Sequence, residues 1–292
     1  MEGFSFRALG TEWSVLIDAH PLTLTLQRAV VEYTTQFEQC FSRFLPHSEV
    51  NAFRKAKAET YPISEELSVL LRRADTLRRL TGGIYDPAVG GLLERAGYGM
   101  PQTNGVSTTG TTTNFSLPHW GLTGTTLTID GPVAFDLGGM GKGYCIDGVA
   151  RVLKGKGCQY YLVEGGGDMW GTTKADGSPW QVAIEYPGKS DLAAGTIALS
   201  HQGLAVSDRF RRRFGRWHHI FNPNLKQTVD TIDGCASVAP SAWDADCMTS
   251  GLFLAHPAKY EALAREFRAE YLVFLPNGET TVSSHWPGEL FV

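Results

Sequence analysis

One stretch, residues 135–147, decides how the fold is interpreted; it reads Phe135-Asp136-Leu137-Gly138-Gly139-Met140-Gly141-Lys142-Gly143-Tyr144-Cys145-Ile146-Asp147. An apolar, strand-like segment, residues 131–135, leads into an Asp and two adjacent glycines. Apolar residues then recur at the i, i+3, i+4 and i+7 spacing of an amphipathic helix: Ile146, Val149, Ala150 and Leu153. A carboxylate beside a glycine turn that opens a helix often holds a phosphorylated ligand, because glycines admit close approach and the first helical N–H groups are unpaired.

The pattern is not specific by itself. It lacks the spacing and the Ser or Thr of a Walker A loop, and it lacks the third glycine of the dinucleotide fingerprint. A tight strand-to-helix turn with incidental glycines would give the same letters. An anion site and a purely structural turn therefore both remain open at this point.

Composition narrows the class of protein. The chain has 292 residues, a net charge of −4 and a pI near 6.1, so it lacks the electrostatic signature of a nucleic-acid-binding protein. The basic cluster at residues 209–213 is local, and it fits a solvated strand face or a local phosphate contact. We expect no nucleic-acid partner.

The cysteines and the N-terminus bear on the compartment. The five cysteines include no CxxC pair, so reduced and mostly buried thiols are expected. Residues 1–7 carry neither a basic segment nor an apolar segment of a signal peptide. No run approaches the roughly 18 apolar residues of a membrane span. The sequence predicts a cytoplasmic protein with no membrane span.

The periodicity predicts an α+β fold with mostly antiparallel sheets and packed helices, because strands outnumber helices and come in runs. A polar, Gly/Thr-rich segment at about 100–115 is interpreted as a surface loop within a single globular unit, residues 1–292. The predicted strands are 6–18, 160–164, 180–186, 195–199, 216–221 and, as the last, 271–275. The predicted helices are 23–43, one that begins at Ser64 and stops at 82–83, one near 141–156, and a pair within 242–269.

The best metal candidate lies near the end of the chain. Asp246 and Ser250 are four residues apart in a predicted helix, which puts a carboxylate and a hydroxyl on one face. Such oxygen ligands suit Mg²⁺, which usually completes its shell with water and substrate phosphate. Helix N-capping by Asp244 or Asp246 is the competing explanation.

Two further motifs carry chemically useful side chains. His219 lies near the end of a predicted strand and could act as a general base near neutral pH, although a histidine at a strand end is more often a surface or hydrogen-bonded residue. Residues 81–92 place Tyr85 and Asp86 in a glycine-bounded turn. This turn is either a helix stop followed by a bend, or a clasp for a planar heterocycle such as adenine or isoalloxazine.

Together these pieces resemble one family, the ApbE-type flavin transferases. The similar motifs occur in the family's order between about residues 6 and 255: Leu9-Gly10-Thr11, Ser42-Arg43-Phe44, Ser48-Glu49-Val50-Asn51, Gly82-Gly83-Ile84-Tyr85-Asp86-Pro87, Asp136-Leu137-Gly138-Gly139, Lys142-Gly143-Tyr144, Glu164-Gly165-Gly166-Gly167-Asp168, His219-Ile220 with Pro223, and Ala245-Asp246 with Ser250.

The resemblance implies a Mg²⁺-dependent FAD:protein FMN transferase. Such an enzyme cleaves FAD, its substrate, releases AMP and attaches FMN through a phosphoester to a Thr or Ser of an acceptor protein. It implies an FAD site that comprises Leu9, Phe44, Ile84, Tyr85, Asp86, Asp136, Lys142 and Ile220. It implies metal ligation by the Gly139 carbonyl, Asp246 and Ser250 with Thr249 beside them, and catalytic roles for His219 and Asp246.

The chain departs from the family pattern at two of these positions. Ser250 stands where Thr is usual, which keeps a ligand oxygen. Asn222 stands where Asp is usual, which removes a charge from the region of His219 or the metal. Two alternatives share the same site: an FAD pyrophosphatase that passes FMN to water, and a non-catalytic FAD-binding module.

Overall fold

A large antiparallel sheet forms the centre of the protein. The computed structural model describes residues 1–99, 116–214 and 217–291, so the predicted surface loop at 100–115 lies outside the described residues. The strands of the large sheet follow one another in space in this order: β1 (Glu2–Ala8), β2 (Thr11–Asp18), β6 (Tyr160–Gly165), β7 (Asp168–Gly171), β10 (Gln202–Asp208), β15 (Gly234–Ala239), β16 (Glu270–Phe274) and β17 (Thr280–Val282). Every neighbouring pair in it is antiparallel, which confirms the predicted α+β class.

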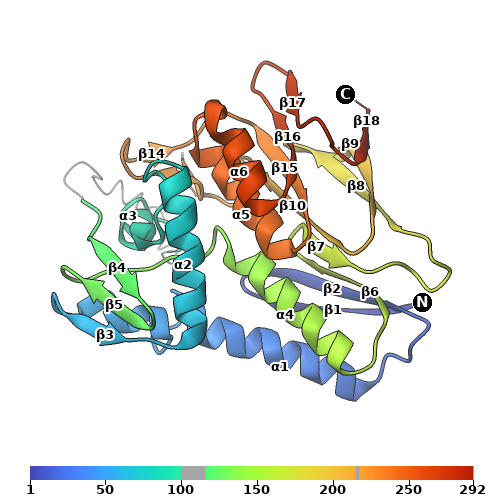
Figure 1. Ribbon diagram of the computed structural model, residues 1–292, viewed down its shortest axis with the longest axis horizontal. Coiled ribbons are helices and arrows are strands. Elements are labelled where there is room, and N and C mark those ends of the chain that lie inside the picture. The colour runs from blue at the N-terminus through green and yellow to red at the C-terminus, as the bar shows by residue number, and fades with distance from the viewer. Residues whose placement is uncertain (100–115, 215–216, 292) are drawn as a thin grey trace.

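Smaller sheets and the helices surround this centre (Figure 1). The small sheets are β18–β9–β8 (Gly288–Leu290, Lys189–Leu199, Trp180–Tyr186), β3–β5–β4 (Thr60–Pro62, Thr126–Ile129, Trp120–Thr123), β11–β12 (Arg213–Phe214, Trp217–His218) and β13–β14 (Phe221–Asn222, Gln227–Thr228). The helices are α1 (Leu24–Phe41), η1 (Glu49–Lys55), α2 (Glu65–Leu80), η2 (Pro87–Val89), α3 (Gly90–Arg95), α4 (Gly141–Gly155), α5 (Ala242–Leu254), η3 (Pro257–Lys259) and α6 (Tyr260–Phe267).

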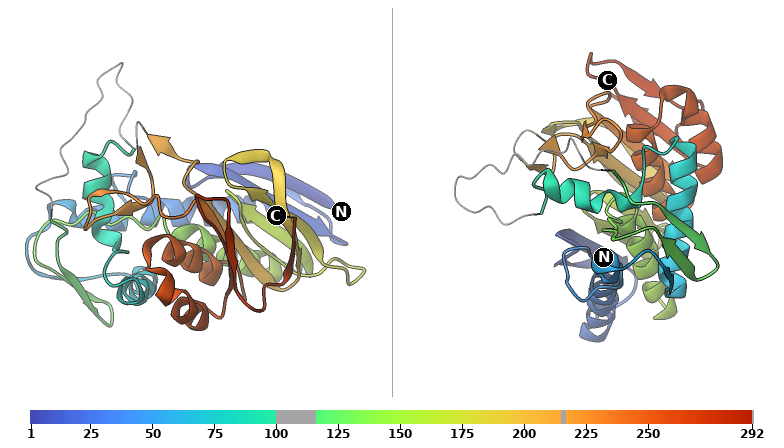
Figure 2. Two further views of the ribbon diagram at one scale, coloured as in Figure 1. Left: turned by 90° about the horizontal axis from the view of Figure 1, so that it is seen from above. Right: turned by 90° about the vertical axis from the view of Figure 1, so that its left-hand side faces the viewer.

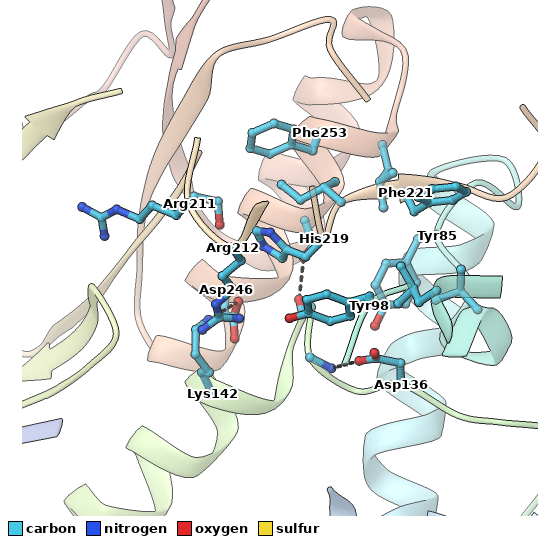
Figure 3. Close-up of a pocket in the computed structure, with 18 of the residues that line it drawn as sticks. Tyr85, Tyr98, Asp136, Lys142, Arg211, Arg212, His219, Phe221, Asp246 and Phe253 are labelled. Atoms are coloured by element: carbon cyan, nitrogen blue, oxygen red, sulfur yellow. Dashed lines mark hydrogen bonds and ion pairs between the residues drawn. The ribbon is translucent and has the colours of Figure 1, made fainter. Parts of the chain in front are cut away.

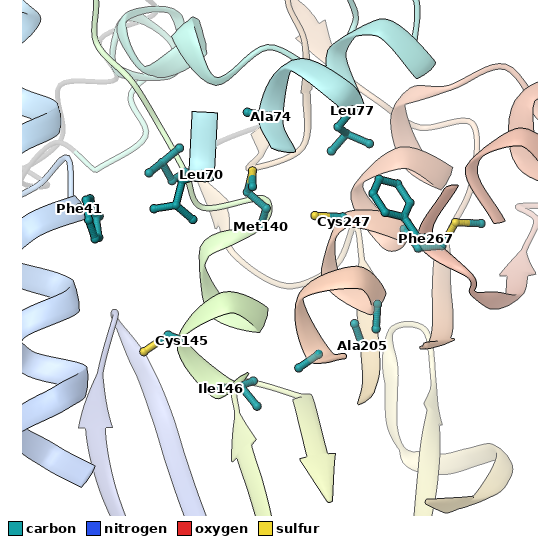
Figure 4. Packing of buried hydrophobic residues seen from close by; sticks show 14 of the residues in the cluster. Phe41, Leu70, Ala74, Leu77, Met140, Cys145, Ile146, Ala205, Cys247 and Phe267 are labelled. Carbon is teal, nitrogen blue, oxygen red and sulfur yellow. The ribbon is translucent and has the colours of Figure 1, made fainter. Parts of the chain in front are cut away.

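The two faces of the large sheet bury different clusters. Along β15, Cys235 and Ala239 pack with the residues of the main core, whereas Ala236 and Val238 pack with the side chains of β8 and β9. Since side chains alternate along a strand, β15 is buried on both faces. Figure 2 shows how the sheets and helices are arranged, from two further sides. Side chains from α2, α4, α5 and β10 meet in the main core (Figure 4).

Capping explains where two of the predicted helices begin. The hydroxyl of Ser64 accepts a hydrogen bond from Leu67 N, and Thr23 does the same for Leu26 N at the start of α1. Helix α2 also carries acidic residues in its first turn and Arg78 and Arg79 in its last, which complements the helix dipole. The helices predicted over 23–43, from Ser64, over 141–156 and within 242–269 are confirmed.

Helices α4 and α5 cap each other. The Asp246 carboxylate of α5 accepts from Gly143 N in the first turn of α4 at 2.9 Å. The Asp147 carboxylate of α4 accepts from Ala242 N and Trp243 N at the start of α5. The N-cap of α5 itself is Ser241, so neither Asp244 nor Asp246 caps its own helix. Each helix therefore satisfies the free N–H groups of the other.

Four predicted strands need correction. Residues 131–135 form no ladder, because their backbone bonds go to separate segments: Val133 N donates to Phe53 O, and Ala134 O accepts from Gly90 N. Residues 6–18 are two strands, since Leu9 and Gly10 have positive φ and form the turn of the β1–β2 hairpin. The prediction of a continuous strand over 216–221 was wrong, because His219 and Ile220 interrupt it. The strand near 271–275 is not the last, since β17 and β18 follow it.

Candidate functional site

A deep cavity lies where the 136–142 turn meets α5 and the segment between β12 and β13. The space, counted together with its open mouth, is about 1030 Å³. Its lining includes most of the predicted site residues: Ile84, Tyr85, Asp86, Asp136, Gly139, Lys142, His219, Ile220, Asp246 and Ser250. Figure 3 shows Lys142, Arg212, His219 and Asp246 turned toward the same space, with Tyr85 and Tyr98 on its other side.

A second cavity opens beside the first and accounts for the two remaining predicted FAD residues. Leu9 and Phe44 line it together with the apolar side chains of Phe37 and Phe41. Phe44 is 57% exposed, so an aromatic face is presented at the mouth of this cavity. The two cavities adjoin, since they share five lining residues: Tyr98, Asp136, Gly138, Lys142 and Arg212.

Asp136 shapes the glycine turn between the cavities. One of its carboxylate oxygens accepts from Gly138 N at 2.7 Å, and the other accepts from Arg43 Nε at 2.6 Å. The Arg43 guanidinium is 6% exposed and also contacts Glu94, so this ion pair is a fixed part of the structure. Asp136 thus holds the turn in place, a role that is compatible with the predicted contact to a ligand.

The start of α4 departs from the expectation of free N–H groups. The N–H group of Gly143 already donates a hydrogen bond to the Asp246 carboxylate, so it is not available to a ligand. A Cβ at Gly143 would lie 2.3 Å from Ala242 O, which is why only glycine fits where α4 meets α5. The anion-binding capacity of this turn therefore depends on side-chain cations more than on the helix terminus.

Lys142 is the buried cation of the site. Its Nζ lies 2.5 Å from Asp168 Oδ2 and 3.5 Å from Asp246 Oδ1. Burial acts to lower the pKa of Lys142, but the two carboxylates outweigh burial and the net shift is upward, so the amine stays charged. Burial raises the pKa of Asp168 in spite of Lys142. Asp168 received no role from the sequence, although it ends one of the family-like motifs.

Three of the predicted metal ligands line the same cavity. Ser250 Oγ lies 2.5 Å from Gly139 O, so the hydroxyl of α5 and the carbonyl of the glycine turn are adjacent. Asp246 lines the same cavity one helical turn away. Thr249 lies behind them: it is fully buried, and its hydroxyl donates to Asp246 O and accepts from Ser207. The geometry thus brings together three of the four predicted ligands.

These groups are all oxygen donors, which is the donor set that Mg²⁺ prefers. Within the described residues, no group of three or more His, Cys, Asp or Glu side chains could hold a metal. A carbonyl, a hydroxyl and one carboxylate fit a hard cation that keeps water or phosphate in its other positions. Thr249 adds no open oxygen to this set.

His219 reaches the cavity from the segment between β12 and β13. Its Nδ1 is buried and has no hydrogen-bond partner among the described residues. Burial, with the positive charges of Arg212 and Lys142, lowers the pKa of His219 to about 3, so the imidazole is neutral at pH 7. The adjacent His218 is anchored, since its Nε2 lies 3.4 Å from Asp230 and its Nδ1 accepts from Ile220 N.

Tyr85 and Asp86 belong to the turn after α2. Tyr85 is buried, lines the cavity, and its hydroxyl lacks a partner in the described part of the chain. Asp86 Oδ1 accepts from Ala88 N and from Trp120 Nε1, both at 2.9 Å. Burial raises the pKa of Asp86, with these hydrogen bonds acting in the opposite direction. The turn is therefore rigid, and its open groups face the cavity.

The side chain of Asn222 does not contact His219 or the predicted metal ligands, contrary to the expectation from the sequence. Its Oδ1 accepts from Asn224 N and Leu225 N, which closes a local turn, and Asn222 is not among the cavity-lining residues. An Asp in this place would accept the same two hydrogen bonds. The substitution therefore removes no contact to His219 or to the predicted ligands.

Comparisons with known proteins identify the family of the chain. A model of the ApbE family matches residues 9–274. The chain therefore belongs to the ApbE family, as its motifs predicted. Among curated relatives, the FAD:protein FMN transferase of Vibrio cholerae serotype O1 is 28% identical over 240 residues, which cover 77% of this chain and 70% of that protein. That of Escherichia coli K12 is 24% identical and covers 91% and 82%.

Solved structures of the family share the fold. The flavin transferase ApbE from Vibrio cholerae has a TM-score of 0.81 at 23% identity and covers 97% of both chains. The ApbE protein of Thermotoga maritima has a TM-score of 0.83 at 23% identity, also with 97% of both chains covered. These likenesses confirm the α+β fold. No helix in the described ranges is long and apolar enough to cross a membrane.

Proposed function

We propose that this protein is a Mg²⁺-dependent FAD:protein FMN transferase. The observation that carries the proposal is that Gly139 O and Ser250 Oγ are adjacent in a cavity that Asp246, Lys142 and His219 also line. Membership in the ApbE family, whose curated relatives are named FAD:protein FMN transferases, supports the same activity. The acceptor would be a Thr or Ser hydroxyl of another protein.

The residues suggest how the bonds change. The acceptor O–H gives its proton to His219 while its oxygen attacks the phosphorus on the flavin side of FAD. The bond from that phosphorus to the bridging oxygen breaks, and the bridging oxygen leaves with AMP. A phosphoester joins FMN to the acceptor. His219 is neutral at pH 7, and negative phosphates bound beside it would raise its low pKa toward that of a useful general base.

The remaining groups bind and orient the substrate. Lys142 places a charged amine beside the phosphates, where it stabilises negative charge that develops on phosphoryl oxygens. Gly139 O, Ser250 Oγ and Asp246 would hold Mg²⁺, which supplies Lewis-acid stabilisation of those oxygens when bound. Tyr85, Ile84 and Ile220 offer an aromatic and apolar wall to a ring of the substrate.

A mass-based transfer assay tests the proposal. The protein is incubated with FAD, Mg²⁺ and an acceptor protein that the Vibrio cholerae relative modifies. We expect the acceptor to gain the mass of FMN less one water, with one AMP released for each transfer. Free FMN and AMP with an unmodified acceptor would indicate the pyrophosphatase instead. FAD that stays intact would indicate a non-catalytic binding module.

Asp246→Asn probes the metal within the same assay. Asn keeps an oxygen that can accept from Gly143 N, so the cap on α4 is retained while the charge is lost. We expect Mg²⁺-dependent AMP release to fall by about 100-fold or more, since the cation loses the only carboxylate proposed to hold it. Activity at the wild-type level would remove Asp246 from the proposed ligand set.

A further inference from the structure

Arg212 lies at the junction of the two cavities and has no role in the family-derived site. It is one of five residues that line both cavities. Its guanidinium makes no hydrogen bond or ion pair with any described residue. Figure 3 shows its side chain running toward Lys142 and Asp246, whereas the side chain of Arg211 points away from them.

Arg209 and Arg211, two of the neighbouring arginines, are already neutralised. Arg211 pairs with Glu185 and lies 3.2 Å from Asp208, and Arg209 pairs with Asp230 and Asp233. On the other side of the cavity, Arg43 is held by Asp136 and Glu94. The charge of Lys142 is likewise balanced by Asp168 and Asp246. Arg212 is therefore the cation that faces both cavities without a carboxylate of its own.

The backbone fixes the position of Arg212. Asp208 Oδ1 accepts from Phe210 N and Arg211 N, both at 2.8 Å, which closes the turn before it. Arg213 then pairs with His218 in the β11–β12 hairpin. Between these two anchors Arg212 has φ of 50°, a left-handed conformation that a non-glycine residue rarely adopts. Such a conformation, held from both sides, is typical of residues placed for function.

We infer that Arg212 binds the phosphates of the flavin dinucleotide, at the place where the two cavities adjoin. A planar guanidinium with free N–H groups matches phosphate oxygens in a bidentate fashion. A ligand that occupies both cavities would lie against Lys142 and Arg212, since both residues line both spaces. The inference rests on the proposed function, because it takes the spanning ligand to be FAD, and it adds a binding residue to that site.

Flavins with and without phosphate test this role. Binding of FAD, FMN and riboflavin is titrated by flavin fluorescence for the wild type, Arg212→Gln and the control Arg28→Gln. Arg28 is exposed on α1 and lines neither cavity, and its replacement removes the same charge. We expect Arg212→Gln to weaken FAD and FMN about tenfold or more and to leave riboflavin unchanged. We expect Arg28→Gln to match the wild type for all three.

A second variant covers the case in which Arg212→Gln fails to fold. Arg212→Lys keeps the charge and loses the bidentate geometry, so its loss for FAD should lie between wild type and Arg212→Gln. Thermal unfolding followed by circular dichroism checks the fold of each variant. Equal loss for FAD and riboflavin, or wild-type affinity of a folded Arg212 variant for FAD, would overturn the inference.

The outcome is separable from that of the proposed function. If the wild type binds FAD but transfers no FMN, the transferase proposal fails while the phosphate readout of Arg212 still holds. If transfer is observed and the Arg212 variants bind FAD as the wild type does, only the role of Arg212 is lost.

Discussion

Asn222 does locally what an aspartate in its place would do. Because its Oδ1 accepts from two backbone N–H groups and its side chain lies outside the cavity, we expect Asn222→Asp to leave the rate of FMN transfer unchanged within about twofold. Asn222→Ala should instead lower the free energy of unfolding by about 1 kcal/mol, because the turn loses its acceptor. Transfer rates and urea unfolding measure the two effects. A large gain of activity in the Asp variant would show that the charge matters.

His219 makes the fold sensitive to acid. Its folded-state pKa is lowered to about 3 from 6.5, mainly by burial. Between these values the unfolded chain binds more protons at His219 than the folded chain, so the stability that comes from the neutral imidazole is lost as pH falls from 6.5 toward 3. We expect thermal unfolding midpoints of the wild type to fall more steeply over this range than those of His219→Gln. Parallel pH curves would contradict the buried neutral imidazole.

Some residue roles could be predicted from the sequence, and others could not. Asp246 and Ser250 could be paired from their spacing alone, because four residues in a helix bring two side chains to one face. Asp168 could not be assigned, since its role depends on Lys142, 26 positions earlier, meeting it across the fold at 2.5 Å. In the sequence, Arg212 is one member of a basic cluster. That it has no carboxylate partner among the described residues follows only from the folded structure.

At the scale of elements, the close meeting of α4 and α5 positions the glycine turn against the predicted ligands. Gly143→Ala would push a methyl group against Ala242 O at 2.3 Å and Asp246 Cβ at 2.8 Å. We expect a loss of about 1–3 kcal/mol of unfolding free energy, because neither backbone can move without disturbing a cap. Metal-dependent AMP release should fall as well, since Asp246 is displaced.

Gly155 provides the matched control within the same helix. A Cβ there meets nothing within 4 Å, and its φ is not in the left-handed region. Gly155→Ala should therefore stabilise the protein by about 0.5–1 kcal/mol, through lower backbone entropy of the unfolded chain. Urea unfolding compares the two variants. If Gly143→Ala raised the free energy of unfolding as Gly155→Ala does, the contact between α4 and α5 would be looser than the distances indicate.

Helix positions were predictable from the sequence, whereas the contacts between helices were not. Apolar periodicity and the caps at Thr23 and Ser64 act over a few residues, so they can be seen in the chain. Asp246 and Asp147 cap each other's helices across about a hundred residues, and a local rule assigns Asp246 to its own helix. The extended segment 131–135 misled the strand prediction for a related reason: its partners lie in separate segments rather than one ladder.

At the scale of the whole molecule, the cavities depend on segments that are far apart in the sequence. The walls come from the turn after α2, the 136–142 turn, the β12–β13 segment and α5. The motifs occur in the order of the ApbE family, and this resemblance predicted that these segments share one site. Local patterns could not do so, because closure of this space depends on how the large sheet brings β10 and β15 beneath α5.

A ligand that bridges these segments should stabilise the protein as a whole. At a free FAD concentration 100 times the Kd, linkage gives about 2.7 kcal/mol if the unfolded chain does not bind FAD. For a chain of this size that corresponds to a rise in Tm of about 4–5 °C. Differential scanning fluorimetry or calorimetry over a hundredfold range of FAD measures it, with adenosine as the control that lacks both flavin and diphosphate. We expect Tm to increase with the logarithm of FAD concentration. A Tm that is independent of FAD would contradict a site assembled from all four segments, since binding confined to one loop would leave global unfolding nearly unchanged.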